Sequence, residues 1–376
     1  MKLAFVTNFC PHYRVKTFES LSRQFDIDFF FYSTGDEWYW QQELGVRQGT
    51  FRHRYLPGIQ AGNTRVTPSL ISYLYRGNYD AIIKCINGRF ALPMTYFAAK
   101  MKGIPFILWS GVWMRIDTPI HRALFPVTRH IYQHSDAIVV YGSHVKEYLL
   151  TEGVAKKLIF IAAHAIDNEL YSRSIPNDQQ LQLKKHLCIE DYQQIVLYVG
   201  RLEEGKGLTY LLDAFGKTAN NSILILVGSG TQRHILEQRT SQKGLRERVR
   251  FVGQVSPEEV IPFHSIASIL VLPSVTTRKL KEPWGLVVNE AFNQGVPVIA
   301  TDAVGAAAGG LVQNAKNGLI IPERDSDALA QAINHLLSDT AFRTRLSQNA
   351  KLSIQSWDNE AMVSGFRDAV RYVTSS

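Results

Sequence analysis

The chain has 376 residues, of which 45% are apolar, and it carries a formal net charge of +8. This length exceeds what one hydrophobic core usually serves, so we expect two domains. No stretch approaches the roughly 20 consecutive apolar residues of a membrane-spanning helix, and the N-terminal residues turn polar too early for a signal peptide. We therefore expect a cytosolic protein.

The first half of the chain alternates short apolar runs with helical patterns. Helices are predicted over 15–25 and 92–103, where apolar residues recur with a helical period. The apolar runs show no alternation of polar and apolar residues, which indicates strands buried on both faces, as in a parallel sheet covered by helices. These predicted strands are 2–9, 27–33, 79–86, 104–110, 136–143 and 157–163.

A polar stretch without periodicity, residues 171–192, marks the predicted domain boundary. We expect a first domain over 1–170 and a second over 171–356. An amphipathic helix over 357–376 has no strand after it, and we expect it to cross back onto the first domain. Beyond the boundary the alternation restarts, with predicted strands at 194–200, 222–230, 248–253, 268–274, 297–302 and 318–322.

This order predicts an α/β chain of two doubly wound parallel-sheet domains in tandem. Predicted helices between the strands of the second domain cover 208–218, 232–244 and 257–267, and another follows Gly285. Folds of this kind bind ligands outside the carboxyl ends of their strands. We therefore expect a ligand cleft there.

The segment GRLEEGKG, residues 200–207, lies between a predicted strand and a predicted helix. Its glycines allow a sharp turn, and Arg201 and Lys206 supply two cationic groups, which together indicate an anion site. The segment nearly matches a P-loop, but residue 207 is glycine where a magnesium-binding Ser or Thr is needed. A plain glycine-rich turn with solvated basic residues is the structural alternative. Gly228 ends the next strand and either admits a ligand or turns the chain.

The segment EPWGLVVNE, residues 282–290, sets two carboxylates around a helix break. Pro283 and Gly285 predict a loop, and a helix is expected to begin near Leu286. Glu282 then lies on the loop and Glu290 inside the helix. The N-terminus of such a helix offers N–H groups and partial positive charge to an arriving phosphate.

Together these residues could bind a molecule that carries both a diphosphate and hydroxyl groups. Carboxylates accept hydrogen bonds from sugar hydroxyls, and Arg201 with Lys206 can stabilise charge on a departing phosphate. The alternative is structural: Glu282 belongs to a solvated charge run, and Glu290 is an exposed helix residue.

The motifs GRLEEGKG, VLPS and EPWGLVVNEAFNQGVPVIATD resemble the nucleotide-binding domain of retaining GT-B glycosyltransferases of family 4 (group 1). The resemblance extends more loosely over the first half. It implies that Glu282 lies near the hydroxyls of the donor sugar and that Glu290 holds the ribose. Arg201 and Lys206 would grip the diphosphate beside the backbone N–H groups of Leu286 and Val287, and the segment from Gly253 would face the base.

The resemblance further implies transfer from a UDP- or GDP-sugar with retention of anomeric configuration, in bacterial cell-surface polysaccharide or glycolipid synthesis. The donor phosphate would take the acceptor proton, and the two glutamates would bind rather than act as a glycosidase pair. No metal-binding cluster is visible, so we expect metal-independent transfer without a further cofactor. The acceptor-side histidine of many relatives is missing, and neither His12 nor His121 can replace it on spacing alone.

The positive charge lies mainly in the first half, where 1–170 hold 19 Lys and Arg against 13 Asp and Glu. With Trp38, Tyr39, Trp40, Trp109 and Trp113, this charge favours a glycan or lipid-linked acceptor and peripheral contact with the inner face of an anionic membrane. Core packing of these aromatic residues is the alternative. No nucleic-acid recognition motif is present. A non-catalytic module that binds nucleotide or carbohydrate is the competing function.

Overall fold

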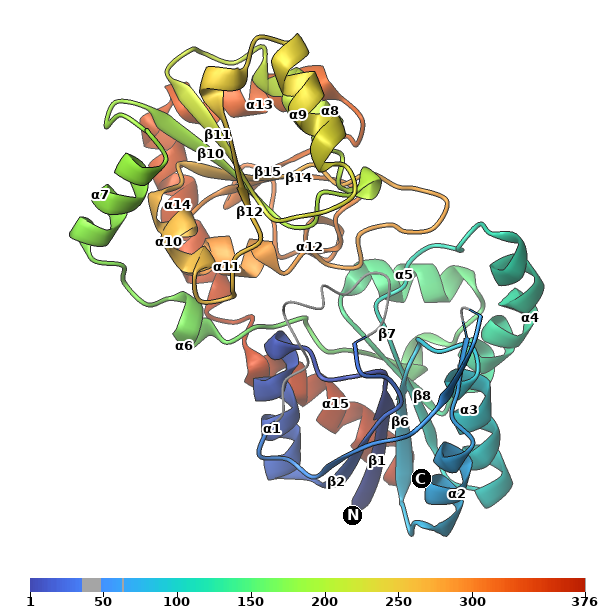
Figure 1. The fold of residues 1–376 in the computed structure, drawn as a ribbon. Helices are drawn as coiled ribbons and strands as arrows, with labels where there is room; N and C mark the ends of the chain where they lie inside the picture. The colour runs from blue at the N-terminus through green and yellow to red at the C-terminus, as the bar shows by residue number, and fades with distance from the viewer. Residues whose placement is uncertain (36–48, 63, 376) are drawn as a thin grey trace. The chain divides into compact units, whose positions relative to one another are not determined.

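The computed structural model describes residues 1–35, 49–62 and 64–375 and contains two compact units (Figure 1). The first unit comprises Met1–Ile166 together with Asp358–Ser376, and the second comprises Asp167–Trp357. Both are α/β units built on a parallel sheet. The predicted fold class, two tandem doubly wound domains, is confirmed.

The first unit is built on a seven-stranded sheet in the order β3-β2-β1-β6-β7-β8-β9. All its strand pairs are parallel. Its central strands are rich in apolar residues and buried along nearly their whole length, as expected for strands with helices on both faces. The strands are β1 (Lys2–Thr7), β2 (Asp26–Phe31), β3 (His53–Tyr55), β6 (Ala81–Cys85), β7 (Phe106–Ser110), β8 (Ala137–Val140) and β9 (Ile159–Ile161).

Helices cover both faces of this sheet, and each face has its own apolar core (Figure 1). One core includes residues of α1 (Val15–Gln24) and α15 (Asn359–Thr374). A short antiparallel hairpin, β4 (Ile59–Ala61) with β5 (Thr64–Val66), lies outside the sheet. The helices of the other core are α2 (Ser69–Arg76), α3 (Ala91–Lys102), α4 (Pro119–His134) and α5 (Ser143–Thr151).

The C-terminal helix α15 packs on the first unit, as the sequence predicts. Its Phe366 is 1% exposed, and its ring centroid lies 5.5 Å from that of Trp109 and 6.0 Å from that of Phe5. Gly365 brings the helix close to the sheet, because an added Cβ would lie 2.3 Å from the carbonyl oxygen of Ile161. The C-terminal helix therefore completes the core of the first unit, which is otherwise built by the N-terminal part of the chain.

The second unit has a six-stranded parallel sheet in the order β12-β11-β10-β13-β14-β15. The first strand of the unit, β10, lies in the middle of the sheet. The next two strands extend the sheet to one edge, and the last three extend it to the other. The strands are β10 (Gln194–Val199), β11 (Ser222–Val227), β12 (Val249–Gly253), β13 (Ile269–Leu272), β14 (Val298–Thr301) and β15 (Gly318–Ile321).

Two helical layers enclose this sheet (Figure 1). One contains α8 (Leu208–Phe215), α9 (Arg233–Gln242) and α13 (Ser326–Ser338), which pack against one another. The other contains α10 (Val260–Ile266), α11 (Val287–Asn293) and α14 (Thr340–Ile354). The remaining helices of the unit are α6 (Asn168–Tyr171), α7 (Asn177–His186) and α12 (Gly305–Ala308).

The predicted strands are all present, but the polar stretch 171–192 differs from expectation because it contains α7. None of the residues of α7 is buried, so the helix has no apolar stripe from which it could be predicted. Helix α4 has Pro126 in its interior, a residue that usually marks the end of a helix.

The aromatic residues predicted to touch an acceptor or a membrane differ in how deeply they are buried. Trp109 is 3% exposed and packs in the core with Phe5 and Phe366, so the packing alternative holds for it. Trp113 is partly buried, with its ring against that of His144. Trp38, Tyr39 and Trp40 lie outside the described residues. Within the described ranges, no helix is long and apolar enough to cross a membrane.

We predict that Phe366→Ala lowers the free energy of unfolding of the first unit by about 3–5 kcal/mol, because it removes a ring from a close-packed core. Asp368→Ala, at an exposed position on the same helix, is the matched control. Urea unfolding followed by circular dichroism measures both. Equal stability of the two variants would contradict the packing of α15 described above.

Candidate active site

The order of strands in the second unit identifies one crevice, at the carboxyl ends of its two central strands. β10 and β13 are neighbours, but the connection after β10 leads to β11 on one side and that after β13 leads to β14 on the other. Loops that leave adjacent strands in opposite directions open a crevice at the carboxyl ends, where doubly wound sheets bind ligands. Arg201 and Lys206 follow β10, and Glu282 follows β13.

Glycines let the loops at the carboxyl ends of these strands come into direct contact. Gly207 has φ of +66°, and an added Cβ would lie 1.9 Å from the carbonyl oxygen of Pro273. At Gly228 an added Cβ would lie 2.0 Å from the carbonyl oxygen of Gly200. Any side chain at either position would separate the loops. For Gly228, this supports the structural alternative of a chain turn, and a contact with ligand stays a prediction.

Lys206 and Glu282 form an ion pair across this crevice, at the switch point between β10 and β13 where the strand order reverses. The Lys206 ammonium donates to Oε2 of Glu282, and the Ser274 hydroxyl donates to the same oxygen at 3.1 Å. The two charged side chains are only 13% and 11% exposed. The structural alternatives, a solvated turn lysine and a glutamate in a solvated charge run, are therefore wrong.

The pKa of Glu282 reflects these neighbours. Burial disfavours its charged form, but the charge and hydrogen bond of Lys206, the Ser274 hydroxyl and the charge of Arg201 outweigh burial. The net result is a pKa below the usual value of a glutamate. The carboxylate is thus held ionised and works as a hydrogen-bond acceptor at neutral pH.

Arg201 is positioned through its backbone. The hydroxyl of the buried Tyr198, on β10, donates to the carbonyl oxygen of Arg201 at 2.7 Å. The loop is also tied to its neighbour, since the amide of Leu202 donates to the carbonyl of Ser229 at 2.8 Å. Arg201 contributes to the low pKa of Glu282, which shows that its charge acts on the same site.

The helix break predicted around residues 282–285 is confirmed, and the loop is anchored on both sides. The amide of Gly305 donates to the carbonyl of Glu282 at 3.0 Å, and that of Ala306 donates to Trp284 at 2.7 Å. Gly285 has φ of +91°, and an added Cβ would lie 2.5 Å from Leu272 Cδ2. The anchored turn fixes where α11 begins.

Helix α11 starts at Val287, with Leu286 as its N-cap residue. The indole N–H of Trp284 donates to the side chain of Asn289 at 2.9 Å, and both residues are buried. This internal bond joins the loop to the first turn of the helix. Sequence reasoning missed both Trp284 and Ser274 as supports of the site, because neither residue type signals such a role by itself.

Glu290 lies inside α11, as predicted, and its side chain is 15% exposed. Its Oε2 lies 3.2 Å from Nε2 of His264, a fully buried residue of α10. The alternative of an exposed helix residue is therefore wrong. Gly253 ends β12, where its carbonyl accepts the amide of Gly228 at 2.7 Å. Its contact with a base stays a prediction.

The structure therefore brings Arg201, Lys206 and Glu282 together and places Glu290 on the helix that follows. Across residues 1–35, 49–62 and 64–375, no group of three or more His, Cys, Asp or Glu side chains is placed to hold a metal ion. Metal-independent transfer stays a prediction.

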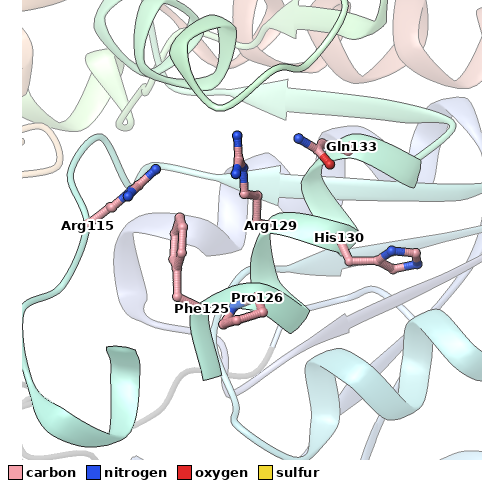
Figure 2. A pocket seen from close by; sticks show the side chains of 6 residues that line it. All are labelled: Arg115, Phe125, Pro126, Arg129, His130 and Gln133. Carbon is pink, nitrogen blue, oxygen red and sulfur yellow. The ribbon is translucent and has the colours of Figure 1, made fainter. Parts of the chain in front are cut away.

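A hollow of about 320 Å³ lies elsewhere, on α4 of the first unit. Figure 2 shows the ring of Phe125 between the side chains of Arg115 and Arg129. Both arginines pair with the buried Glu152, at 2.8 Å and 3.5 Å. None of the predicted site residues lines this hollow, and its cationic groups already have a carboxylate partner.

Comparison with known families finds a match that covers most of the second unit. Residues 179–353 match the family model described as glycosyl transferases group 1. This range contains all the residues of the site described above.

Two curated relatives are named as glycosyltransferases. An uncharacterized glycosyltransferase of Methanocaldococcus jannaschii is 29% identical over 235 residues, which are 61% of this chain and 58% of the relative. The alpha-D-kanosaminyltransferase of Streptomyces kanamyceticus is 29% identical over 271 residues, which are 68% of this chain and 67% of that enzyme.

Among solved structures, HepE of Anabaena in complex with UDP resembles the whole chain. The TM-score is 0.78 at 19% identity, and the match covers 98% of this chain and 99% of that one. At this identity the likeness concerns the fold. The chain has the fold of the GT-B glycosyltransferases.

We predict that Lys206→Met destabilises the second unit by about 3–5 kcal/mol, because it leaves the Glu282 carboxylate buried without its cation. The double variant Lys206→Met/Glu282→Gln should recover most of this loss, since it removes the buried charge as well. Chemical denaturation of both variants at pH 7 provides the measurement. If the double variant is no more stable than the single one, the two side chains do not form the buried pair described here.

Proposed function

We propose that this chain is a group 1 glycosyltransferase that moves a sugar from a nucleotide-sugar donor to a glycan or lipid-linked acceptor. One observation carries the proposal: the buried Lys206–Glu282 pair at the switch point of the second unit, inside the segment that matches the group 1 family. The crystal structure of HepE with UDP supports a nucleoside diphosphate as the ligand of this fold.

Lys206 and Arg201 would hold the diphosphate of the donor. An ammonium has three N–H donors, and Lys206 directs one of them to Glu282, so others can reach a phosphate. Negative charge builds on the diphosphate as the sugar departs. Fixed cations in a site shielded from water stabilise that charge more strongly than mobile ones in water would.

The two glutamates would bind hydroxyl groups. Glu282, held ionised by Lys206 and Ser274, would accept from hydroxyls of the donor sugar, and Glu290 from those of the ribose. Neither residue is proposed as a nucleophile or as a general acid. Their role is to orient the donor so that its anomeric carbon faces the acceptor.

The start of α11 would lie beside the diphosphate. The absence of a side chain at Gly285 lets the ligand approach the amides of Leu286 and Val287. Gly228 and Gly253 end the two neighbouring strands and would lie on the side of the base. The base itself is proposed to be uracil or guanine, from a UDP- or GDP-sugar.

Transfer is proposed to retain the anomeric configuration and to need no metal ion. The bond between the anomeric carbon and the diphosphate oxygen breaks, and a bond from the same carbon to the acceptor oxygen forms on the same face. The proton of the acceptor hydroxyl passes to the departing diphosphate, so atoms and charges balance. NMR of the product anomer and activity in chelator test these two points.

We further propose that the chain acts in cell-surface polysaccharide or glycolipid synthesis, peripheral to the inner face of an anionic membrane. The excess of basic residues in 1–170 supports this proposal. The aromatic argument is weaker than the sequence indicates, since Trp109 belongs to the core.

The activity is tested with a panel of UDP- and GDP-sugars and glycan acceptors. We predict that Glu282→Gln lowers kcat/KM about 10- to 100-fold, because a hydrogen bond to a charged group is lost. Glu204→Gln, an exposed carboxylate between Arg201 and Lys206 in sequence, is the control and should retain wild-type activity.

Equal activity of the two variants would remove Glu282 from the reaction. A wild-type protein that binds a nucleoside diphosphate but never turns over a donor would instead favour the non-catalytic binding module.

Membrane contact is tested by sedimentation with vesicles. Vesicles rich in phosphatidylglycerol should bind the protein, more weakly at high salt, while phosphatidylcholine vesicles should not. Equal, negligible sedimentation with both kinds would contradict the membrane proposal and leave the transferase proposal intact.

A further inference from the structure

His264 is a buried side chain in contact with Glu290 of the candidate site. It lies on α10, it is 0% exposed, and its Nε2 is 3.2 Å from Oε2 of Glu290. A carboxylate has no hydrogen to donate when ionised, so the imidazole Nε2–H is the donor and Glu290 Oε2 is the acceptor.

The other ring nitrogen of His264, Nδ1, also indicates that the proton is on Nε2. Nδ1 is buried and has no hydrogen-bond partner among the residues that the structure describes. A proton on Nδ1 would place an unsatisfied N–H group in the interior, whereas a bare lone pair there costs less. The Nε2–H of His264 is therefore directed at Oε2 of Glu290.

Tyr171 approaches the same carboxylate from α6. This residue is 4% exposed, and α6 packs against α11, the helix of Glu290. Burial, and after it the charge of the nearby Glu290, raise the pKa of Tyr171. The tyrosine thus stays a neutral hydroxyl donor. Two buried side chains, from segments about 90 residues apart in sequence, therefore lie on helices that pack against the helix of Glu290.

We propose that His264 and Tyr171 are positioning residues that hold Glu290 so that its carboxylate receives the ribose hydroxyls of the donor nucleotide. The proposal rests on the proposed function, because it assumes a nucleoside diphosphate at this site. A glutamate side chain has three rotatable bonds, and holding it before the ligand arrives removes an entropic cost of binding. Hydrogen bonds to one side of the carboxylate would hold it in place while its remaining lone pairs stay available to the ribose hydroxyls.

The experiment compares ribose and deoxyribose ligands. Dissociation constants are measured by calorimetry for UDP, GDP and their 2′-deoxy forms with wild type, His264→Leu, His264→Gln and Tyr171→Phe. Whichever ribonucleotide binds wild type more tightly serves as the probe. His234→Leu, at an exposed histidine of α9, is the matched control.

We expect His264→Leu to weaken binding of the ribonucleotide about tenfold, because a hydrogen bond to a charged group that binds the ligand is lost. Binding of the 2′-deoxy form should change far less, so the preference for ribose falls. His264→Gln restores an N–H donor and should restore the preference, and Tyr171→Phe should reduce it while keeping the packing of the ring. His234→Leu should behave as wild type.

Two results would overturn the proposal in distinguishable ways. If wild type binds the ribonucleotide and its preference for ribose is unchanged in both His264→Leu and Tyr171→Phe, the positioning role is wrong and the proposed function stands. If wild type binds neither nucleotide, the proposed function fails and the inference fails with it. Tyr171→Phe decides the matter on its own should His264→Leu not fold.

Discussion

The candidate site depends on one buried ion pair. Lys206 and Glu282 come from loops that leave adjacent strands in opposite directions, and they meet where the strand order of the sheet reverses. Burying two charges costs free energy that attraction between them only partly offsets. A pair of this kind is a poor way to stabilise a fold. It is a good way to keep a cation and a carboxylate oriented and desolvated before a charged, hydroxyl-rich ligand arrives.

Glycines in the surrounding loops let the backbone segments that carry the pair approach closely. Gly207 touches the carbonyl of Pro273, and Gly228 touches that of Gly200, so three loops meet without side chains between them. Trp284 then anchors the turn that carries Glu282 through its bond to Asn289. The rigid sheet thus fixes the positions of side chains that lie on loops, which is how doubly wound folds usually build their sites.

Much of this could be predicted from the sequence, and what could not has a physical reason. Uninterrupted apolar runs identify the buried strands, and Pro283 with Gly285 identifies the helix break. Helix α7 could not be predicted from an apolar stripe because it buries none of its residues. The roles of Ser274 and His264 could not be predicted, because their partners lie 8 and 26 positions away and are brought near only by folding. Trp109 was a candidate for stacking on a sugar, but its position in the core follows from packing with the C-terminal helix.

The central claim is that the switch point of the second unit binds a nucleoside diphosphate. Hydrogen exchange followed by mass spectrometry, with and without UDP or GDP, tests it most directly because it reports where the ligand protects the backbone. The account predicts slower exchange at 200–207 and 282–290 in the presence of one of the two nucleotides. Protection confined to other segments, or no protection at millimolar nucleotide, would contradict it.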